Sequence, residues 1–89
     1  MPERRVTVGS KVGLHARPAA LVCKAAAAQP VEITIRKDGV DPVSADSILG
    51  LMTLGAEFGD EVVLTAEGSG ADEALDELAE LISSELDQQ

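Results

Sequence analysis

Residues 31–37, "VEITIRK", constrain the fold more than any other stretch of the chain. Apolar and polar side chains alternate along them, so Val31, Ile33 and Ile35 share one face. Such alternation is typical of a strand in an antiparallel sheet that has one packed face and one face in water. The chain therefore needs elements that cover one side of a sheet and leave the other side open.

The residues after this strand predict a hairpin. Asp38–Gly39 is a strong signal for a two-residue turn between antiparallel strands. The return strand, around residues 40–45, contains Pro42. Because proline has no N–H to donate to a neighbouring strand, we expect this strand at an edge of the sheet.

Two further stretches are predicted strands. Residues 5–9 alternate with Val6 and Val8 on one face. Residues 60–67 alternate in the same way, and the inward face is formed by Val62, Leu64 and Ala66.

Three helices are predicted between and after the strands. Residues 16–29 are mostly strong helix formers, and Pro30 ends this helix. A short helix begins at Asp46 or Ser47 and is closed by Gly55. The last helix, residues 71–87, carries apolar residues at helical spacing, namely Leu75, Leu78, Ala79, Ile82 and Leu86.

The order of these elements, β-α-β-β-α-β-α, indicates an α+β fold. Two split β-α-β units give a mostly antiparallel sheet with helices on one face. With 89 residues, we expect a single domain over residues 1–89. One Phe is the only aromatic residue, so the core must be built from Val, Ile, Leu and Ala.

The charge and the cysteine content exclude several classes of protein. Sixteen acidic and seven basic residues give a formal net charge of −9, which argues against a nucleic-acid partner or an anionic membrane surface. A single cysteine, Cys23, excludes an internal disulfide and fits a reducing compartment. Because it lies inside the first helix, we expect it to be a small core residue. We find no signal peptide or membrane-spanning stretch, so we expect a cytoplasmic protein without membrane insertion.

The only histidine, His15, stands in "GLHARPAA" directly before the first helix. If that helix begins at Ala16, its free N–H groups at Ala16 and Arg17 are directed toward the imidazole. A helix N-terminus attracts anions, and an arginine guanidinium matches phosphate well. This setting disfavours a cationic imidazole and suits a neutral one, which has a lone pair and can act as a nucleophile that gains a phosphoryl group.

The motif alone leaves a second interpretation open, since a lone histidine at a helix start is often an ordinary surface residue or cap. The sequence gives less support to a metal site or a nucleotide site. One His and one Cys cannot supply a metal site, so we expect no metal. No glycine-rich phosphate loop follows a strand, so we expect no nucleotide cofactor.

The short helix has two apolar faces. At about 100° per residue, Leu51 and Leu54 fall on one side, and Ile48, Leu49 and Met52 fall on the other. One side must pack on the sheet, so the other is expected to be partly exposed and to bind a partner. On the first helix Arg17, Ala20 and Lys24 share one side. The two helices together would offer a patch with an apolar centre and a basic edge.

"GLHARPAA", "DSILGLMTLG" and "GADEALDEL" together resemble the histidine-containing phosphocarrier (HPr) family of the bacterial phosphoenolpyruvate–sugar phosphotransferase system. The resemblance covers essentially the whole chain. It implies an open-faced β-sandwich, in which a four-stranded antiparallel sheet is covered on one face by three helices.

The resemblance also implies a function and its residues. His15 accepts a phosphoryl group on Nδ1 from phospho-enzyme I and passes it to sugar-specific enzyme II A domains, with Arg17 beside the phosphate. The chain is then a phosphocarrier without a cofactor, and not an enzyme. The family pattern makes Ile48, Leu49 and Met52 part of the docking surface for both partners. We further expect a monomer.

The chain departs from the family pattern at one position, and two alternative functions remain. In members of the family regulated by a serine kinase, a basic residue typically precedes the serine that opens the short helix, whereas Asp46 precedes Ser47 here. We therefore do not expect Ser47 to be a regulatory phosphorylation site. The chain could also be a carrier of a related nitrogen- or fructose-branch phosphorelay. The second alternative is a regulatory binding module, but that function would leave the "HARP" stretch unexplained.

Overall fold

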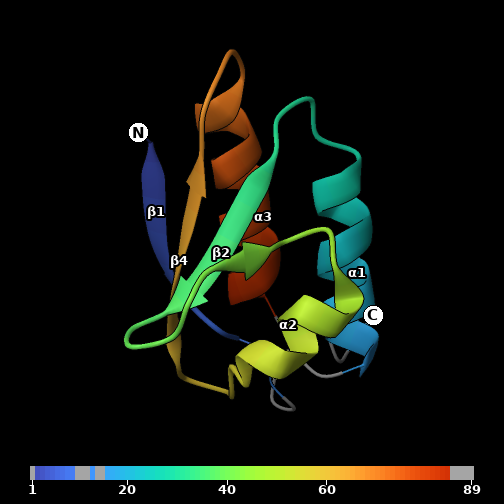
Figure 1. The fold of residues 1–89 in the computed structure, drawn as a ribbon, viewed down its shortest axis with the longest axis vertical. Helices are drawn as coiled ribbons and strands as arrows, with labels where there is room; N and C mark the ends of the chain where they lie inside the picture. The colour runs from blue at the N-terminus through green and yellow to red at the C-terminus, as the bar shows by residue number, and fades with distance from the viewer. Residues whose placement is uncertain (1, 10–12, 14–15, 85–89) are drawn as a thin grey trace.

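The computed structural model describes residues 2–9, 13 and 16–84. Its elements follow the predicted order (Figure 1): β1 (Glu3–Thr7), α1 (Ala16–Ala27), β2 (Ile33–Lys37), β3 (Val43–Ser44), α2 (Ile48–Leu54), β4 (Glu61–Ala66) and α3 (Ala71–Ser83).

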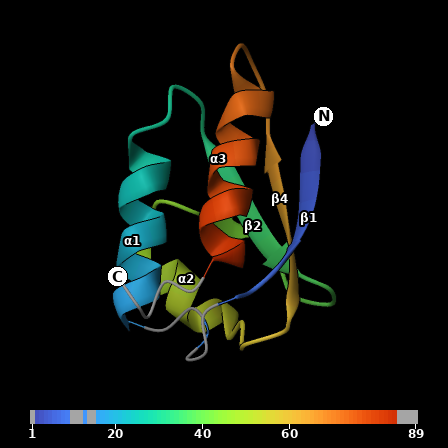
Figure 2. The ribbon, with the colours of Figure 1, turned by 180° about the vertical axis from the view of Figure 1, so that it is seen from behind.

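The four strands form one antiparallel sheet in the order β1-β4-β2-β3. Helices α1 and α3 cover one face of it, and α2 lies at one end of the helical layer, packed against α1 (Figures 1 and 2). The opposite face of the sheet is open. This arrangement confirms the predicted α+β fold with an open-faced sheet, and it confirms that the return strand β3 lies at an edge.

The core lies between the sheet and the helices, where the predicted faces meet. Ile33 and Ile35 of β2 are buried, and Val31 is partly buried against them. The predicted inward residues of β4 are buried as well, and α3 contributes its apolar stripe: Val62, Leu64, Ala66, Leu75, Leu78 and Ile82. Burying one such Val, Leu or Ile side chain contributes roughly 1.5–3 kcal/mol, so aliphatic packing holds the helices on the sheet.

The hairpin between β2 and β3 differs from the prediction. A two-residue loop would place Ile35 opposite Pro42, but its partner is Val43. Asp38–Gly39 still forms a turn, in which Val40 N–H donates to Lys37 C=O at 3.0 Å. The one-residue change in register places the partly buried Val43 against the core, so the apolar pattern decides the pairing rather than the loop length.

All four strands and two helices have different ends from those predicted. Strand β2 begins at Ile33 rather than at residue 31, β3 spans Val43–Ser44 rather than residues 40–45, and β4 spans Glu61–Ala66 rather than residues 60–67. The first strand begins earlier, at Glu3, and ends at Thr7, although Val8 remains buried beyond it. The first helix ends at Ala27 rather than at residue 29. The last helix ends at Ser83 rather than at residue 87.

The end of α3 has a local cause. The Ser84 backbone is extended, and its hydroxyl donates to Leu81 C=O at 2.6 Å. The Ser83 hydroxyl donates to Glu80 C=O at 3.1 Å. Serine hydroxyls compete in this way for the backbone acceptors that a continuing helix would use. Leu86, predicted on the apolar stripe, lies outside the described residues.

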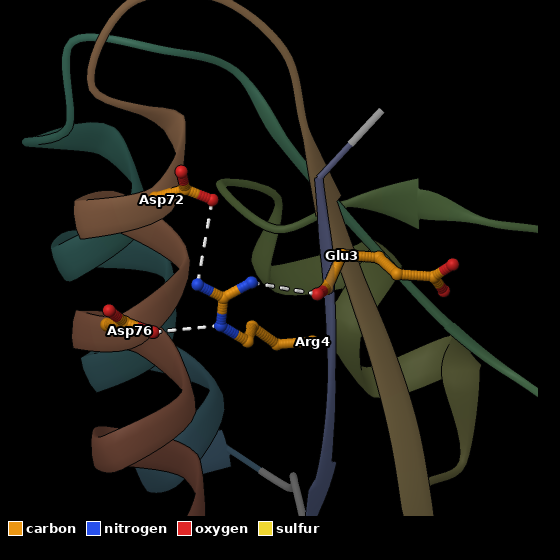
Figure 3. A network of polar contacts seen from close by, with 4 residues as sticks. All are labelled: Glu3, Arg4, Asp72 and Asp76. Atoms are coloured by element: carbon orange, nitrogen blue, oxygen red, sulfur yellow. Dashed lines mark hydrogen bonds and ion pairs between the residues drawn. The ribbon is translucent and has the colours of Figure 1, made fainter.

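Arg4 ties the edge strand β1 to α3 (Figure 3). Its Nε lies 2.8 Å from Asp76 Oδ1, and its Nη2 lies 3.6 Å from Asp72 Oδ1. Its Nη1 donates to Glu3 C=O at 3.0 Å. The hydrogen bond that Arg4 donates to the Asp76 carboxylate raises the pKa of Arg4 above its ordinary value. This cation therefore offsets part of the negative charge of α3.

Candidate functional site

The first turn of α1 is where the sequence places its candidate nucleophile. The helix begins at Ala16, as predicted, and Pro18 is buried in its first turn. Proline fits there because the first N–H groups of a helix have no intrahelical partner. His15 lies outside the described residues, so its position and its contacts stay a prediction, and so does phosphate binding by Ala16 and Arg17.

The predicted basic side of α1 is exposed. Arg17, Ala20 and Lys24 follow one another at intervals of three and four residues, and all three are exposed. Residues at this spacing lie on the same side of a helix.

Arg17 and Lys24 differ from the other described cations. Arg4, Arg5, Arg36 and Lys37 each form an ion pair with a carboxylate. Within residues 2–9, 13 and 16–84, Arg17 and Lys24 are the two basic side chains outside these ion pairs. On a chain of net charge −9, they leave a local positive charge on the exposed side of α1.

Helix α2 begins and ends as its sequence predicts. Ser47 is the N-cap, and its Oγ accepts the N–H of Gly50 at 3.0 Å. Gly55 ends the helix in the left-handed conformation, with φ +72°. Ser47 therefore has a structural role at the start of this helix.

The two predicted faces of α2 are also confirmed. Leu51 and Leu54 are buried, whereas the exposed fractions are 45% for Ile48, 74% for Leu49 and 41% for Met52. In a helix of seven residues, three large apolar side chains are thus left in water. Their exposure agrees with the predicted partner surface, and their role in docking stays a prediction.

Helices α1 and α2 are in contact, so their exposed sides form one surface. A hydrogen bond links them directly, because the Cys23 thiol donates to the backbone carbonyl of Asp46, next to the N-cap of α2. We call this surface the α1–α2 face and define it by its exposed residues: Arg17, Ala20, Lys24, Ile48, Leu49 and Met52.

Residue 13 packs against the segment that follows α2. Gly13 has φ +73°, and a Cβ added to it would lie 2.5 Å from the carbonyl oxygen of Ala56. Only glycine tolerates both the left-handed backbone and this close approach. The backbone at residue 13 is therefore held close to residues 56–57.

Two features of this region were not predicted from the sequence. One is the bond between Cys23 and Asp46; Cys23 was expected to be a small core residue, and it is half-buried against the core. The other is Phe58, which is exposed on a turn after α2. The glycine after this phenylalanine was the available signal for the turn.

In the part of the chain that the structure describes, no group of His, Cys, Asp and Glu side chains could hold a metal ion. Among the helices of the same residues, none is long and apolar enough to cross a membrane.

Comparison with known proteins agrees with this geometry. A model of the family described as "PTS HPr component phosphorylation site" matches residues 2–84. The phosphocarrier protein HPr of Streptomyces coelicolor is 47% identical over 88 residues, which cover 99% of this chain and 95% of that protein. The HPr-like protein Crh of Bacillus subtilis is 42% identical, with 97% of this chain and 100% of that protein covered. The phosphocarrier protein NPr of Shewanella violacea is 40% identical, with coverages of 97% and 93%.

Solved structures show the same fold. The crystal structure of an HPr from Thermoanaerobacter tengcongensis has a TM-score of 0.89 and 40% identity, and covers 100% of this chain and 99% of that one. The crystal structure of Crh from Bacillus subtilis, described as a swapped dimer, has a TM-score of 0.68 and 40% identity. It covers 96% of this chain and 97% of that one.

Proposed function

This chain belongs to the HPr family of phosphocarrier proteins of the phosphotransferase system, and from that premise we propose that it relays a phosphoryl group between two protein partners. In this proposal, His15 accepts the group from phospho-enzyme I and gives it to enzyme II A domains that serve sugar uptake. The chain is a carrier that becomes phosphorylated, and catalysis belongs to its partners.

The proposed chemistry is a pair of in-line displacements. The Nδ1 lone pair of neutral His15 attacks the phosphorus, the N–P bond forms, and the bond to the donor breaks with its electron pair on the donor. The second partner reverses this step with its own nucleophile. Phosphoryl transfer depends chiefly on positioning and charge stabilisation. Arg17 and the free N–H groups at the start of α1 would supply the positive charge.

The observation that carries the proposal is the α1–α2 face. Its first residue, Arg17, comes two positions after His15 in the chain. The face combines three exposed apolar side chains of α2 with the cations Arg17 and Lys24, which no carboxylate pairs with in the described residues. Such a face fits a partner that presents acidic groups around an apolar centre. Since both partners must bind and leave, small interfaces of the transient class are expected.

Incubation with enzyme I and labelled phosphoenolpyruvate tests the proposal. The wild-type chain should gain one acid-labile phosphate, and His15→Ala should gain none while circular dichroism and the melting temperature stay close to wild type. Label on the His15→Ala chain would refute the assignment of the nucleophile. Failure of the wild-type chain to gain phosphate would refute the relay itself.

A second candidate function uses the same histidine with different partners. The identity to NPr, 40%, lies close to the values for HPr and Crh, so a nitrogen- or fructose-branch relay is the alternative. Transfer from the phosphorylated chain to sugar-specific A domains, measured beside transfer to regulatory A domains, separates the two. A purely regulatory binding module would accept no phosphate from enzyme I.

We propose a cytoplasmic location, which the single cysteine supports because it fits a reducing compartment. We also propose that the working form is a monomer, which leaves the α1–α2 face free for its partners. The swapped dimer of the related Crh makes oligomeric state a necessary measurement, and sedimentation at working concentration provides it.

A further inference from the structure

Phe58 is the only aromatic residue of the chain, and it is not used by the core. It lies between α2 and β4, and its exposed fraction is 60%. Phenylalanine is among the residues most often buried. An aromatic side chain left in water by a chain with no other aromatic residue calls for an explanation.

The turn that carries Phe58 is tightly braced. The Asp60 N–H donates to Glu57 C=O at 3.0 Å, and the Glu57 N–H donates to Asp60 Oδ2 at 2.9 Å. Lys37 Nζ lies 3.2 Å from the same carboxylate oxygen. Gly59, with φ +85°, supplies the left-handed residue that such a turn requires.

Hydrogen bonds to Val8, the residue after β1, fix the turn further. The Gly59 N–H donates to Val8 C=O at 3.0 Å, and the Val8 N–H donates to Asp60 C=O at 2.9 Å. The backbone beneath Phe58 is thus held from both sides. A binding partner would not have to order this backbone, which lowers the entropy cost of a contact at Phe58.

The turn also lies against the chain at residue 13, shortly before the proposed phosphoryl acceptor His15 in the sequence. Its first residues pack against Gly13, two positions before His15 in the chain. In both ribbon views, the segment from residue 55 to residue 60 lies at the end of the molecule where α2 and the first turn of α1 also lie (Figures 1 and 2). The Phe58 turn therefore lies against the chain at residue 13, two positions before His15, and α1 begins at residue 16, one position after it.

We propose that Phe58 is a further docking residue for the phosphoryl donor, which it contacts beside the α1–α2 face. The inference rests on the proposed relay. That relay has one donor and several acceptors, and a rigid aromatic side chain needs a matching apolar pocket. A pocket of this kind can be maintained in the one donor more readily than in acceptors of differing sequence. Aromatic side chains are also enriched in the well-packed centres of interfaces.

The test compares two exposed apolar residues on similar turns. Val40 is 41% exposed and follows Gly39, which has φ +83°, in a turn closed by the bond from Val40 N–H to Lys37 C=O. In both ribbon views this hairpin points away from α1 (Figures 1 and 2). Val40→Ala is therefore the matched control for Phe58→Ala, and Phe58→Tyr keeps the ring.

Steady-state phosphorylation by enzyme I is measured with each full-length variant as the substrate. Phe58→Ala should raise KM about three- to tenfold and leave kcat within about twofold, because a docking contact made equally in ground and transition states affects KM alone. Phe58→Tyr and Val40→Ala should match wild type, and transfer to acceptor A domains should be unchanged. The melting temperature of Phe58→Ala should stay close to wild type.

Four results would overturn the inference. Equal KM values for Phe58→Ala and Val40→Ala, with phosphate still accepted by wild type, would leave the relay standing and remove Phe58 from it. A change confined to acceptor transfer would assign Phe58 to the wrong partner. If the wild-type chain sediments as a dimer and Phe58→Ala sediments as a monomer, the partner that Phe58 contacts is a second copy of this chain. No phosphorylation of wild type would refute the relay, and this inference with it.

Discussion

The Cys23 thiol, in the middle of α1, donates a hydrogen bond to the backbone carbonyl of Asp46, with 3.0 Å between sulfur and oxygen. Asp46 immediately precedes Ser47, the N-cap of α2. The bond therefore joins the helix that follows His15 to the start of the helix that carries the exposed apolar residues. It fixes the two halves of the α1–α2 face relative to each other.

Cys23→Ala should loosen this connection. Loss of one hydrogen bond of this kind costs about 0.5–1.5 kcal/mol of unfolding free energy, at the low end because a thiol is a weak donor. KM for phosphorylation should rise as well, since α2 is less firmly placed. Cys23→Ser keeps a donor and should recover most of both losses. Urea denaturation and steady-state kinetics measure the two effects, and identical curves for all three proteins would show that the bond contributes nothing.

Leu49 and Leu51 provide a matched pair on α2. Leu49 is 74% exposed, and Leu51 is fully buried. Leu51→Ala should cost about 2–5 kcal/mol of unfolding free energy, because it removes a buried side chain and leaves a cavity. Leu49→Ala should leave stability nearly unchanged, and Leu49→Glu should weaken binding to both enzyme I and the A domains, since a partner would have to desolvate the charge.

Calorimetry and binding measurements decide this prediction. Met52→Glu should act like Leu49→Glu, with a near-normal melting temperature and weaker binding. A collapse of the melting temperature in either glutamate variant would mean that this side of α2 supports the fold and is not a docking surface.

The fold was predictable because its elements depend on local periodicity. The alternation in β2 and β4 and the helical spacing in α3 each specify an inward face. The described residues of these faces are buried as predicted, except that Val31 and Ala79 are only partly buried. Ends of elements were less predictable. Helix α3 ends at Ser83 because two serine hydroxyls donate to backbone carbonyls that a longer helix would use. The apolar pattern alone predicts that the helix continues.

The candidate site was predictable to a smaller degree. The two faces of α2 follow from helical geometry, and the cap at Ser47 follows from residue type. The placement of Phe58 depends on contacts between Gly13 and Ala56 and between Val8 and Gly59, which are distant in sequence. No local pattern encodes them. The role of His15 rested on the resemblance to a family, to which the comparisons then showed that the chain belongs.

Asp60 should make the stability of the Phe58 turn depend on pH. The hydrogen bond from the Glu57 backbone, followed by that from Lys37, lowers the pKa of Asp60 below its ordinary value of 3.8. The folded protein therefore favours the ionised carboxylate. Its stabilising contribution is present above the unfolded pKa and is lost as the pH falls through the lowered pKa.

Asp60→Asn should accordingly be less stable than wild type at about pH 6, and the difference should shrink as the pH falls below about 4. Asp41→Asn is the control, because the exposed Asp41 forms no ion pair or side-chain hydrogen bond with the residues that the structure describes. Urea denaturation at a series of pH values gives both curves. A constant difference between Asp60→Asn and wild type over this range would contradict the assignment.

Ser47 is the residue where structure and regulation can be separated. Its Oγ caps α2 through Gly50 N–H, so Ser47→Ala should lower the unfolding free energy by about 0.5–2 kcal/mol. Ser47→Asp should fold normally, because aspartate is also a good N-cap and its charge suits a helix N-terminus. The new charge lies next to the exposed Ile48, however, so phosphate acceptance from enzyme I should be slower.

Whether a kinase modifies Ser47 in the cell is a different question, and we predict that it does not do so efficiently. The preceding residue is Asp46, whose carboxylate hydrogen-bonds with the Ser44 hydroxyl beside the cap. A kinase that requires a basic residue at that position would meet a negative charge, and the same charge would repel the phosphoserine product. Mass spectrometry of the protein from sugar-fed cells, before and after mild acid removes phosphohistidine, provides the test. An abundant acid-stable phosphate on Ser47 would show that Asp46 is not the barrier inferred here.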